Sequence, residues 1–222
     1  APGATTEMLL PTEYEGYRSM DISYVEKKIE DESRISDERW KPSYVWRGES
    51  YEQIVGHDLK FDLIIASNVL QRTPNLVAFL NGLAGIVAVD GEIRFAFPDY
   101  RFCVDWSRQP SRLADIIGAY IENRTKPGIA DVYDYIGITH TGGVRDSPID
   151  HWATSPAERA QQTFKVPEQV WHSQAIAEAY FAREKYVDIH VWRFDSQIFS
   201  EYMHFLTNTG LVHLALVNLI PA

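Results

Sequence analysis

The sequence predicts an α/β fold, in which helices flank a mostly parallel sheet and a helical and loop region is inserted between its elements. The first observation is residues 61–67, which are apolar on both faces, as in a strand from the middle of a parallel sheet. The second is the order of the elements that follow. Residues 74–91 have apolar side chains at helical spacing, and residues 90–98 predict a turn and a strand that stops at Pro98. Alternation of strand, polar loop and helix is typical of a parallel sheet.

Shorter elements are predicted before residue 61. Residues 1–11 contain a glycine turn that leads into a small apolar patch. There follow a strand that ends at Asp21, a charged helix or loop at 23–42, a second short strand at 43–50 and a short helix at 51–59.

The part from residue 99 to residue 174 predicts an insertion rather than core. A helix is expected at 110–124, and the remainder is polar and rich in turn residues. After it come a helix at 173–186, a strand with period-two alternation at 187–194, an Asp-capped helix at 195–210 and a last strand at 211–221. The whole chain, 1–222, is predicted to be one domain with an insertion at about 100–174.

Composition excludes several classes of protein. The chain has 222 residues, of which 45% are hydrophobic, enough for a sizeable core and too many for general disorder. The formal net charge is −10 and no basic stripe stands out, which argues against a nucleic-acid partner. The single cysteine, Cys103, excludes an intrachain disulfide framework, and cytoplasmic residence fits this composition.

No segment for membrane insertion or export is predicted. No apolar stretch reaches the roughly 20 residues that a membrane-spanning helix needs. The N-terminal residues lack the charged and apolar segments of a signal peptide. The chain begins without methionine, so we expect either processing or a longer polypeptide of which these residues are part.

The polar residues after the strand at 61–67 are the first candidates for a binding site. Ligands of open α/β sheets bind in the crevice beyond the carboxyl ends of the strands, and Ser67 and Asn68 lie at that position. The alternative is an ordinary connection between a strand and a helix, in which Asn68 is a turn residue and Asn75 a helix cap. Position alone leaves both interpretations open.

Gly3 and Asp21 are a second candidate pair. A glycine turn followed about 20 residues later by an acidic residue at a strand end is how α/β folds hold an adenosine group, with the carboxylate on the ribose hydroxyls. One glycine and one aspartate are a weak signal, and taken alone they are better explained as a turn glycine and a surface aspartate.

Asp99 is a candidate for catalysis, because it follows the strand that ends at Pro98 and is expected at the same edge of the sheet. Arg101 and Asp105 follow the same strand. The alternative interpretation is a helix N-cap with surface charges.

Two histidines are further candidates for catalysis. His190 shares one face of a predicted strand with Asp188, although buried strand histidines are more often hydrogen-bonded structural residues. His140 is a weaker candidate. It lies in a segment with metal-ligating residue types, but their spacing matches no zinc pattern, and an exposed loop uses the same residues, so no metal site is predicted. The residues of that segment are His140, Asp146, Asp150 and His151.

Several segments, taken in order, resemble class I S-adenosylmethionine-dependent methyltransferases. Residues 61–99 resemble the family's region from the fourth to the fifth strand: an apolar strand after Phe-Asp, a polar loop that ends in Thr-Pro-Asn, a helix, a turn and a strand that ends in Pro-Asp. Residues 98–120 and 186–202 are similar to segments of a methyltransferase-domain subgroup associated with bacterial glycan biosynthesis.

The resemblance implies a Rossmann-like doubly wound sheet, S-adenosylmethionine as cofactor and methyl transfer to a small-molecule or glycan acceptor. It implies contacts of Gly3 with the methionine part, of Asp21 with the ribose, and of residues 46–49 with the adenine. The expected cofactor-binding residues are Gly3, Asp21, Trp46, Gly48, Glu49, Ser67 and Asn68. A hydroxyl acceptor needs a general base, for which Asp99, His190 and His140 are the candidates.

The sequence departs from the family at several places. Asn68 stands where the family usually has histidine, and Gln71 and Arg72 stand where it has Glu-His. The family's first and last strands have no counterpart, so we expect another segment, partner domain or partner chain to supply them. Two functions remain open: a methyltransferase, or a catalytically degenerate methyltransferase-like binding or assembly module of a larger glycan-synthesis protein.

Overall fold

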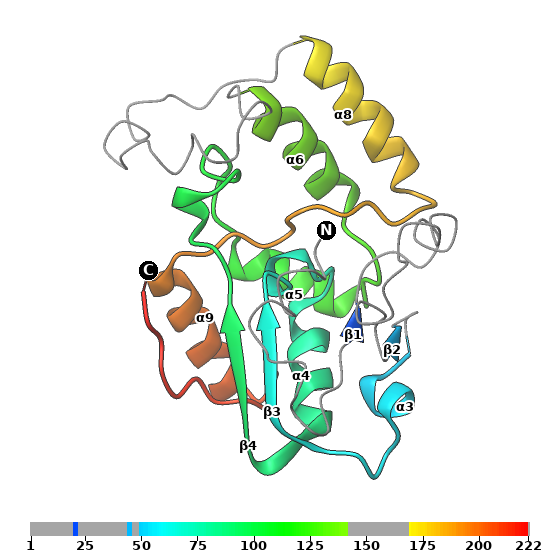
Figure 1. Ribbon diagram of the computed structural model, residues 1–222. Coiled ribbons are helices and arrows are strands. Elements are labelled where there is room, and N and C mark those ends of the chain that lie inside the picture. Colours follow the sequence, from blue (N-terminus) through cyan, green and yellow to red (C-terminus); the bar gives the residue numbers. More distant parts are fainter. Residues whose placement is uncertain (1–19, 22–43, 46–48, 142–168, 222) are drawn as a thin grey trace, which may run out of the picture. The chain divides into compact units, whose positions relative to one another are not determined.

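The computed structural model describes residues 20–21, 44–45, 49–141 and 169–221, which contain helices and short parallel strands. Two compact units are found, residues 1–70 with 80–96 and residues 71–79 with 97–222. In chain order the elements are β1 (Met20–Asp21), β2 (Tyr44–Val45), α3 (Tyr51–Val55), β3 (Phe61–Ser67), the 3-10 helix η3 (Leu70–Arg72), α4 (Leu76–Ile86), β4 (Val87–Ala96), the 3-10 helix η4 (Tyr100–Phe102), α5 (Leu113–Ile121), α6 (Ile129–Thr141), α8 (Gln169–Phe181) and α9 (Ser196–Asn208) (Figure 1).

In the first unit, β3 and β4 form a parallel pair, seen as adjacent arrows in Figure 1. Ile64 pairs with Ile93 and Ser67 pairs with Ala96, and α4 connects the two strands. The predicted strand–helix–strand order and the parallel pairing are therefore confirmed. The ladder has one irregularity near its start, where Gly91 approaches the backbone so closely that a Cβ atom there would lie 2.9 Å from the carbonyl oxygen of Phe61.

The two short strands predicted near the N-terminus also pair with each other. Met20 of β1 lies opposite Tyr44 of β2 in a parallel register. The predicted helix that follows begins at a capping box, in which the Ser50 hydroxyl accepts a hydrogen bond from the Gln53 amide and the Gln53 side chain accepts one from the Ser50 amide. These local signals explain why α3 starts at Tyr51.

The second unit contains a helix that the sequence did not predict. Residues after 124 were expected to be insertion rather than core, but α6 spans Ile129–Thr141 and packs beside α8 (Figure 1). Val132 is fully buried and Ile138 is 6% exposed, so α6 contributes to the core of this unit. Turn-forming and polar residues among its apolar positions hid the helical pattern in the sequence.

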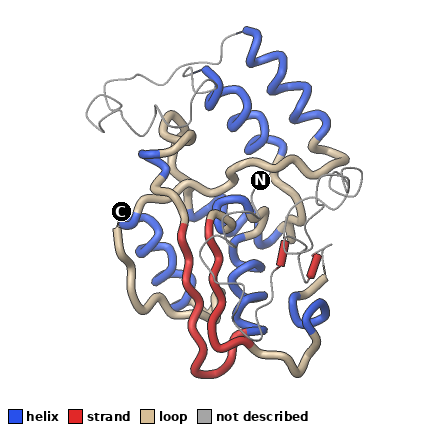
Figure 2. The backbone as a smooth tube through the Cα atoms, in the orientation of Figure 1, coloured by secondary structure: helices blue, strands red, loops and turns tan. Residues whose placement is uncertain are grey.

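The predicted strand at 187–194 is wrong, because this segment has no regular secondary structure (Figure 2). It is nevertheless buried on both sides, as Ile189 and Trp192 show. Its backbone amides bond to several separate segments instead of one neighbouring strand. Those of Val191 and Trp192 donate to the Gln71 carbonyl at 2.7 and 3.0 Å, and that of Arg193 donates to the Ser111 hydroxyl. Dispersed partners prevent a strand ladder.

The C-terminal helix is confirmed, whereas the strand predicted after it is wrong. The Asp195 carboxylate accepts a hydrogen bond from the Ile198 amide at 2.8 Å and caps α9. The chain leaves the helix near Gly210, whose φ of 72° lies in the left-handed region that favours glycine. Residues 213–221 have no strand partner among the described residues, and Val217 is 94% exposed.

No described helix is both long enough and apolar enough to cross a membrane.

Two helical glycines should respond in opposite ways to replacement by alanine. A Cβ atom at Gly82 in α4 would lie 2.9 Å from Cδ2 of the buried Tyr51 ring, whereas one at Gly118 in α5 would meet nothing within 4 Å. We expect Gly118→Ala to raise the free energy of unfolding by about 0.5–1 kcal/mol through helix propensity. We expect Gly82→Ala to lower it by about 1–3 kcal/mol through overpacking. Urea denaturation of both variants measures this difference, and equal stabilisation would contradict the packing of α4 on α3.

Candidate functional site

A buried carboxylate–imidazole pair lies in the second unit. Asp105 belongs to the turn after η4, and His190 belongs to the irregular segment 187–194. The Nδ1–H group of His190 donates to Oδ2 of Asp105, and the two side chains are 9% and 2% exposed. The pair therefore joins two segments far apart in the sequence.

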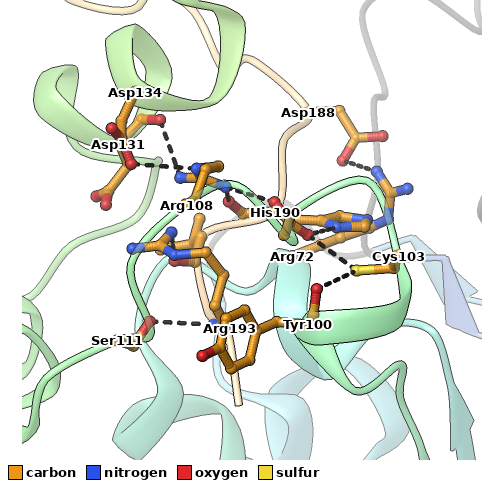
Figure 3. Close-up of polar contacts among 12 residues, drawn as sticks. Arg72, Tyr100, Cys103, Arg108, Ser111, Asp131, Asp134, Asp188, His190 and Arg193 are labelled. Atoms are coloured by element: carbon orange, nitrogen blue, oxygen red, sulfur yellow. Dashed lines mark hydrogen bonds and ion pairs between the residues drawn. The ribbon is translucent and has the colours of Figure 1, made fainter. Parts of the chain in front are cut away.

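Arg108 holds this pair from the opposite side. Its Nη1 atom donates to Oδ1 of Asp105 at 2.7 Å and to the backbone carbonyl of His190 at 2.8 Å. Its Nε atom donates to Oδ2 of Asp134 on α6 at 3.1 Å. The guanidinium is fully buried, and Figure 3 shows it between Asp134 and His190. Because guanidinium is planar and presents its donors in fixed directions, these contacts fix the position of Asp105.

Asp105 is ionised across the physiological range. Burial on its own raises the pKa of this carboxyl, but the hydrogen bond and charge of His190, together with Arg108, outweigh burial and lower the pKa to about 2. The neighbouring Cys103 stays a protonated thiol, because burial and the charge of Asp105 raise its pKa. Its sulfur donates weakly to Oδ2 of Asp105 at 3.5 Å.

Tyr135 on α6 covers the other side of the imidazole. Its ring centroid lies 5.8 Å from that of His190, and Cζ of Arg108 lies 5.3 Å from the centre of the same ring. Burial, followed by the charge of Asp105, raises the pKa of Tyr135. The phenol therefore stays neutral and forms an uncharged wall of the site.

The Nε2 atom of His190 has no hydrogen-bond partner among the described residues, and 9% of the side chain is exposed. An ionised carboxylate on Nδ1 keeps the proton of a neutral imidazole at that nitrogen, so the lone pair is placed on Nε2. This arrangement can accept a proton at Nε2 and stabilise the imidazolium that results.

A metal ion is a second chemical possibility at this site. Cys103, Asp105 and His190 place a sulfur, an oxygen and a nitrogen atom within 4.8 Å of one another, a donor set that zinc accepts. Each of these atoms already has a hydrogen-bond partner within the trio, and Arg108 places a positive charge on the carboxylate. The trio therefore fits a hydrogen-bonded acid–base pair better than a cation site.

Asp99 and Asp188 were predicted at or near the site, but their carboxylates pair with other residues. The Asp99 carboxylate accepts a hydrogen bond from the Arg101 amide at 3.0 Å, so Asp99 caps η4, as the alternative interpretation expected, and it also pairs with the Arg101 guanidinium at 2.6 Å. The same interpretation made Asp105 a surface charge, which is wrong because Asp105 is buried. Asp188 pairs with Arg72 at 2.8 Å.

The predicted cofactor residues that the structure describes lie in the first unit. Ser67 ends β3 and is buried. Asn68 follows it with a φ of 54°, and its backbone amide donates to the Ala96 carbonyl at 2.7 Å. Asp21 ends β1, and Glu49 is exposed just before α3. Outside the described residues lie Gly3, Trp46 and Gly48, and the side chains of Asp21 and His140 are likewise not described.

Asn75 caps a helix, as one interpretation of the sequence predicted. Oδ1 of Asn75 accepts a hydrogen bond from the Ala78 amide at 3.1 Å, and its Nδ2 atom donates to the Ala119 carbonyl at 3.2 Å.

Sequence reasoning missed Arg108 and Tyr135. The sequence contains several aspartates that could pair with Arg108. It does not indicate which of them does so.

The described residues thus define a mixed α/β protein with pairs of parallel strands and several helices. No family model matches the chain, and neither curated proteins nor solved structures gave a match.

The charge of Asp105 should contribute measurably to stability. A pKa lowered from 3.8 to about 2 corresponds to about 2 kcal/mol at neutral pH. Asp105→Asn also leaves the buried Arg108 with one carboxylate fewer, so we expect a loss of about 2–4 kcal/mol at pH 7. The exposed pair of Glu92 and Arg94 supplies the control, and Glu92→Gln should leave stability unchanged.

The pH dependence has a defined sign. Because the folded pKa of Asp105 is lowered, its contribution is complete above its ordinary value of 3.8 and is lost as the pH falls through about 2. The difference between wild type and Asp105→Asn in urea denaturation should shrink as the pH falls from about 4 to 2. A constant difference throughout would show that the charge of Asp105 is not what stabilises the fold.

Proposed function

We propose that this protein transfers a methyl group from S-adenosylmethionine to a hydroxyl of a small-molecule or glycan acceptor, with His190 as the general base. The observation that carries the proposal is the pairing of His190 Nδ1–H with the ionised, buried Asp105, which leaves Nε2 to take a proton. Arg108 holds both members of this pair in one orientation.

The first unit supports the choice of cofactor. The parallel strands β3 and β4 with their connecting α4 form one β–α–β unit, and we propose that this unit belongs to a Rossmann-like doubly wound sheet. Ser67 and Asn68 place a hydroxyl and an amide at the carboxyl end of β3, which fits the polar parts of the cofactor. Asp21 ends β1, where a carboxylate would bind ribose hydroxyls.

The residues of the chain then have separate tasks. S-adenosylmethionine, when bound, supplies a methyl group that is already activated on its sulfonium, so the protein mainly positions and deprotonates the acceptor. Nε2 of His190 takes the proton of the acceptor hydroxyl, and Asp105 stabilises the imidazolium. Among the three predicted bases, His190 is favoured over Asp99, whose carboxylate already caps η4 and pairs with Arg101.

The alternative function is a catalytically degenerate binding or assembly module. It is favoured by exposed aromatic side chains at the end of α8, where Tyr180 is 68% and Phe181 50% exposed. Such a module would keep the fold and lose the cofactor. Binding of S-adenosylmethionine separates the two functions.

Calorimetry should detect S-adenosylmethionine and S-adenosylhomocysteine at micromolar dissociation constants. Asp21→Ala should abolish binding, because ribose hydroxyls lose their acceptor, whereas Asp62→Ala, a surface change in β3, should not. No heat at millimolar cofactor would rule out the enzyme and favour the module.

Replacement of the base should affect turnover and not cofactor binding. We expect His190→Gln to reduce release of S-adenosylhomocysteine, in the presence of mixed sugar acceptors, by about 10²–10⁴-fold. His204→Gln is the control, because His204 is an exposed residue of α9 whose Nδ1 atom contacts Ser200 in the same helix. Equal turnover of His190→Gln and wild type would eliminate His190 as the base.

A further inference from the structure

An open groove of the second unit is lined by residues of α5, α6 and α8 and has a volume of about 790 Å³. Small-molecule sites usually occupy clefts of about 300–1,000 Å³ that are mostly apolar and carry a few polar groups. Helices α6 and α8, which form its two long walls, pack side by side (Figure 1). We call this cleft the α6–α8 groove.

Large apolar side chains on one wall of the groove are exposed. Ile176 and Tyr180 are 45% and 68% exposed, and they share one face of α8 because they are four residues apart. Ile129, at the start of α6, is 51% exposed and lines the same groove. Cζ of Arg183 lies 5.3 Å from the centre of the Tyr180 ring. Exposed apolar side chains that gather in a cleft are typical of a binding surface.

Two carboxylates with oxygen atoms open to a ligand lie on α6. Asp131 and Asp134 are three residues apart and so share one face of the helix, and Figure 3 shows both beside Arg108. Oδ2 of Asp134 accepts from Nε of Arg108 at 3.1 Å, and no donor to its Oδ1 is found among the described residues. Asp131 has only a long ion pair, with Nη1 of Arg124 at 3.5 Å, while Nε of Arg124 lies closer to Glu122 at 2.6 Å.

Asp131 is poorly stabilised as an ion within the fold. Burial raises the pKa of its carboxyl, and the positive charges of Arg193, Arg108 and Arg124 offset this only in part. An extra hydrogen-bond donor at this carboxylate would therefore be favourable. A carboxyl group whose pKa is raised by burial and which lines a cleft is typical of a functional site.

The charges around the groove give no preference to an ion of either sign. The carboxylates that line it or share its arginines are nearly equal in number to the cations beside them. The carboxylates are Asp105, Asp115, Asp131, Asp134 and Glu122, and the cations are Arg108, Arg112, Arg124, Lys126, Arg183 and Arg193. A neutral ligand avoids the cost of removing an ion from water.

The two walls together define the form of that ligand. Carboxylates only accept hydrogen bonds, so the ligand must present donors to α6. The apolar wall needs a C–H surface on the other side. A pyranose ring has hydroxyls along its edge and C–H groups on its faces, and it therefore matches both walls.

We propose that the α6–α8 groove binds the ring of a neutral sugar, with its hydroxyls donating to Asp131 and Asp134 and its C–H face packed on Tyr180. Arg183 donates to an oxygen atom of the ligand. The site does not rest on the proposed function, because neither His190 nor a cofactor takes part in it.

Saturation-transfer NMR titrations of the full chain test this site with the methyl glycosides of glucose, galactose and mannose. Cyclohexanol, putrescine and acetate are the comparison probes. We expect at least one glycoside to bind more tightly than cyclohexanol, which has a six-membered ring but a single hydroxyl. Tyr180→Ala and Asp131→Asn should each weaken that binding about 5- to 10-fold. Phe205→Ala and Asp62→Asn, which change an exposed ring and an exposed carboxylate outside the groove, should bind like wild type.

Several results would overturn the proposal: no binding of any glycoside, tighter binding of putrescine or acetate, cyclohexanol bound as tightly as the glycoside, or equal binding by both variants and wild type. Self-association that Tyr180→Ala abolishes in sedimentation, without glycoside binding, would assign the groove to a second copy of the chain instead. Because burial disfavours the ionised carboxyl, Asp131→Asn should unfold no earlier than wild type. If it does unfold earlier, the exposed Tyr180 decides the test alone.

Discussion

The buried ion pair between Arg108 and Asp105 is the constraint on which the second unit depends. Removing a guanidinium and a carboxylate from water costs several kcal/mol per ion, and only close, well-directed partners recover it. Arg108 meets this condition with all three nitrogen atoms of its guanidinium. Nε contacts Asp134, and Nη1 contacts Asp105 and the His190 carbonyl. Nη2 reaches the Asp131 carbonyl at 3.5 Å. The turn after η4, helix α6 and the segment around His190 must therefore come together for the charge to be buried.

The same constraint explains the irregular course of residues 187–194. A strand would direct alternate amides and carbonyls to one neighbour, whereas here the His190 carbonyl serves Arg108 and the Arg193 carbonyl accepts the Ser111 amide. The segment forms no regular ladder of backbone hydrogen bonds, and its backbone instead makes the contacts that fix the imidazole. Its near-complete burial supplies the apolar contacts that hold it in the absence of a sheet, as Ile189 and Phe194 show. Orientation of His190 is thus a product of backbone position as much as of the bond to Asp105.

Local signals in the sequence were sufficient for part of this structure. The apolar run at 61–67, the helical spacing after Pro74 and the caps at Asn75 and Asp195 each depend on neighbours within a few residues, and each was found as expected. Period-two alternation at 187–194 predicted a half-buried strand, but residues 189–194 are all buried and have no regular secondary structure, so the pattern indicated neither the burial nor the partners of this segment. His190 could be proposed as a site residue from its type and place. Its partner could not, because Asp105 lies 85 residues away and nothing local distinguishes it from a surface charge.

The two arginine–aspartate pairs near His190 differ in how completely their hydrogen-bonding groups are satisfied, and this difference sets how much each arginine can contribute to stability. Every nitrogen of Arg108 has an acceptor and its side chain is fully buried, so it can only hold the site together. Arg72 has one nitrogen on Asp188, a buried Nε–H without a described partner, and 28% of its side chain exposed. A buried donor without a partner costs about 1–3 kcal/mol, so we expect Arg72 to stabilise this unit less than Arg108, which has no such atom.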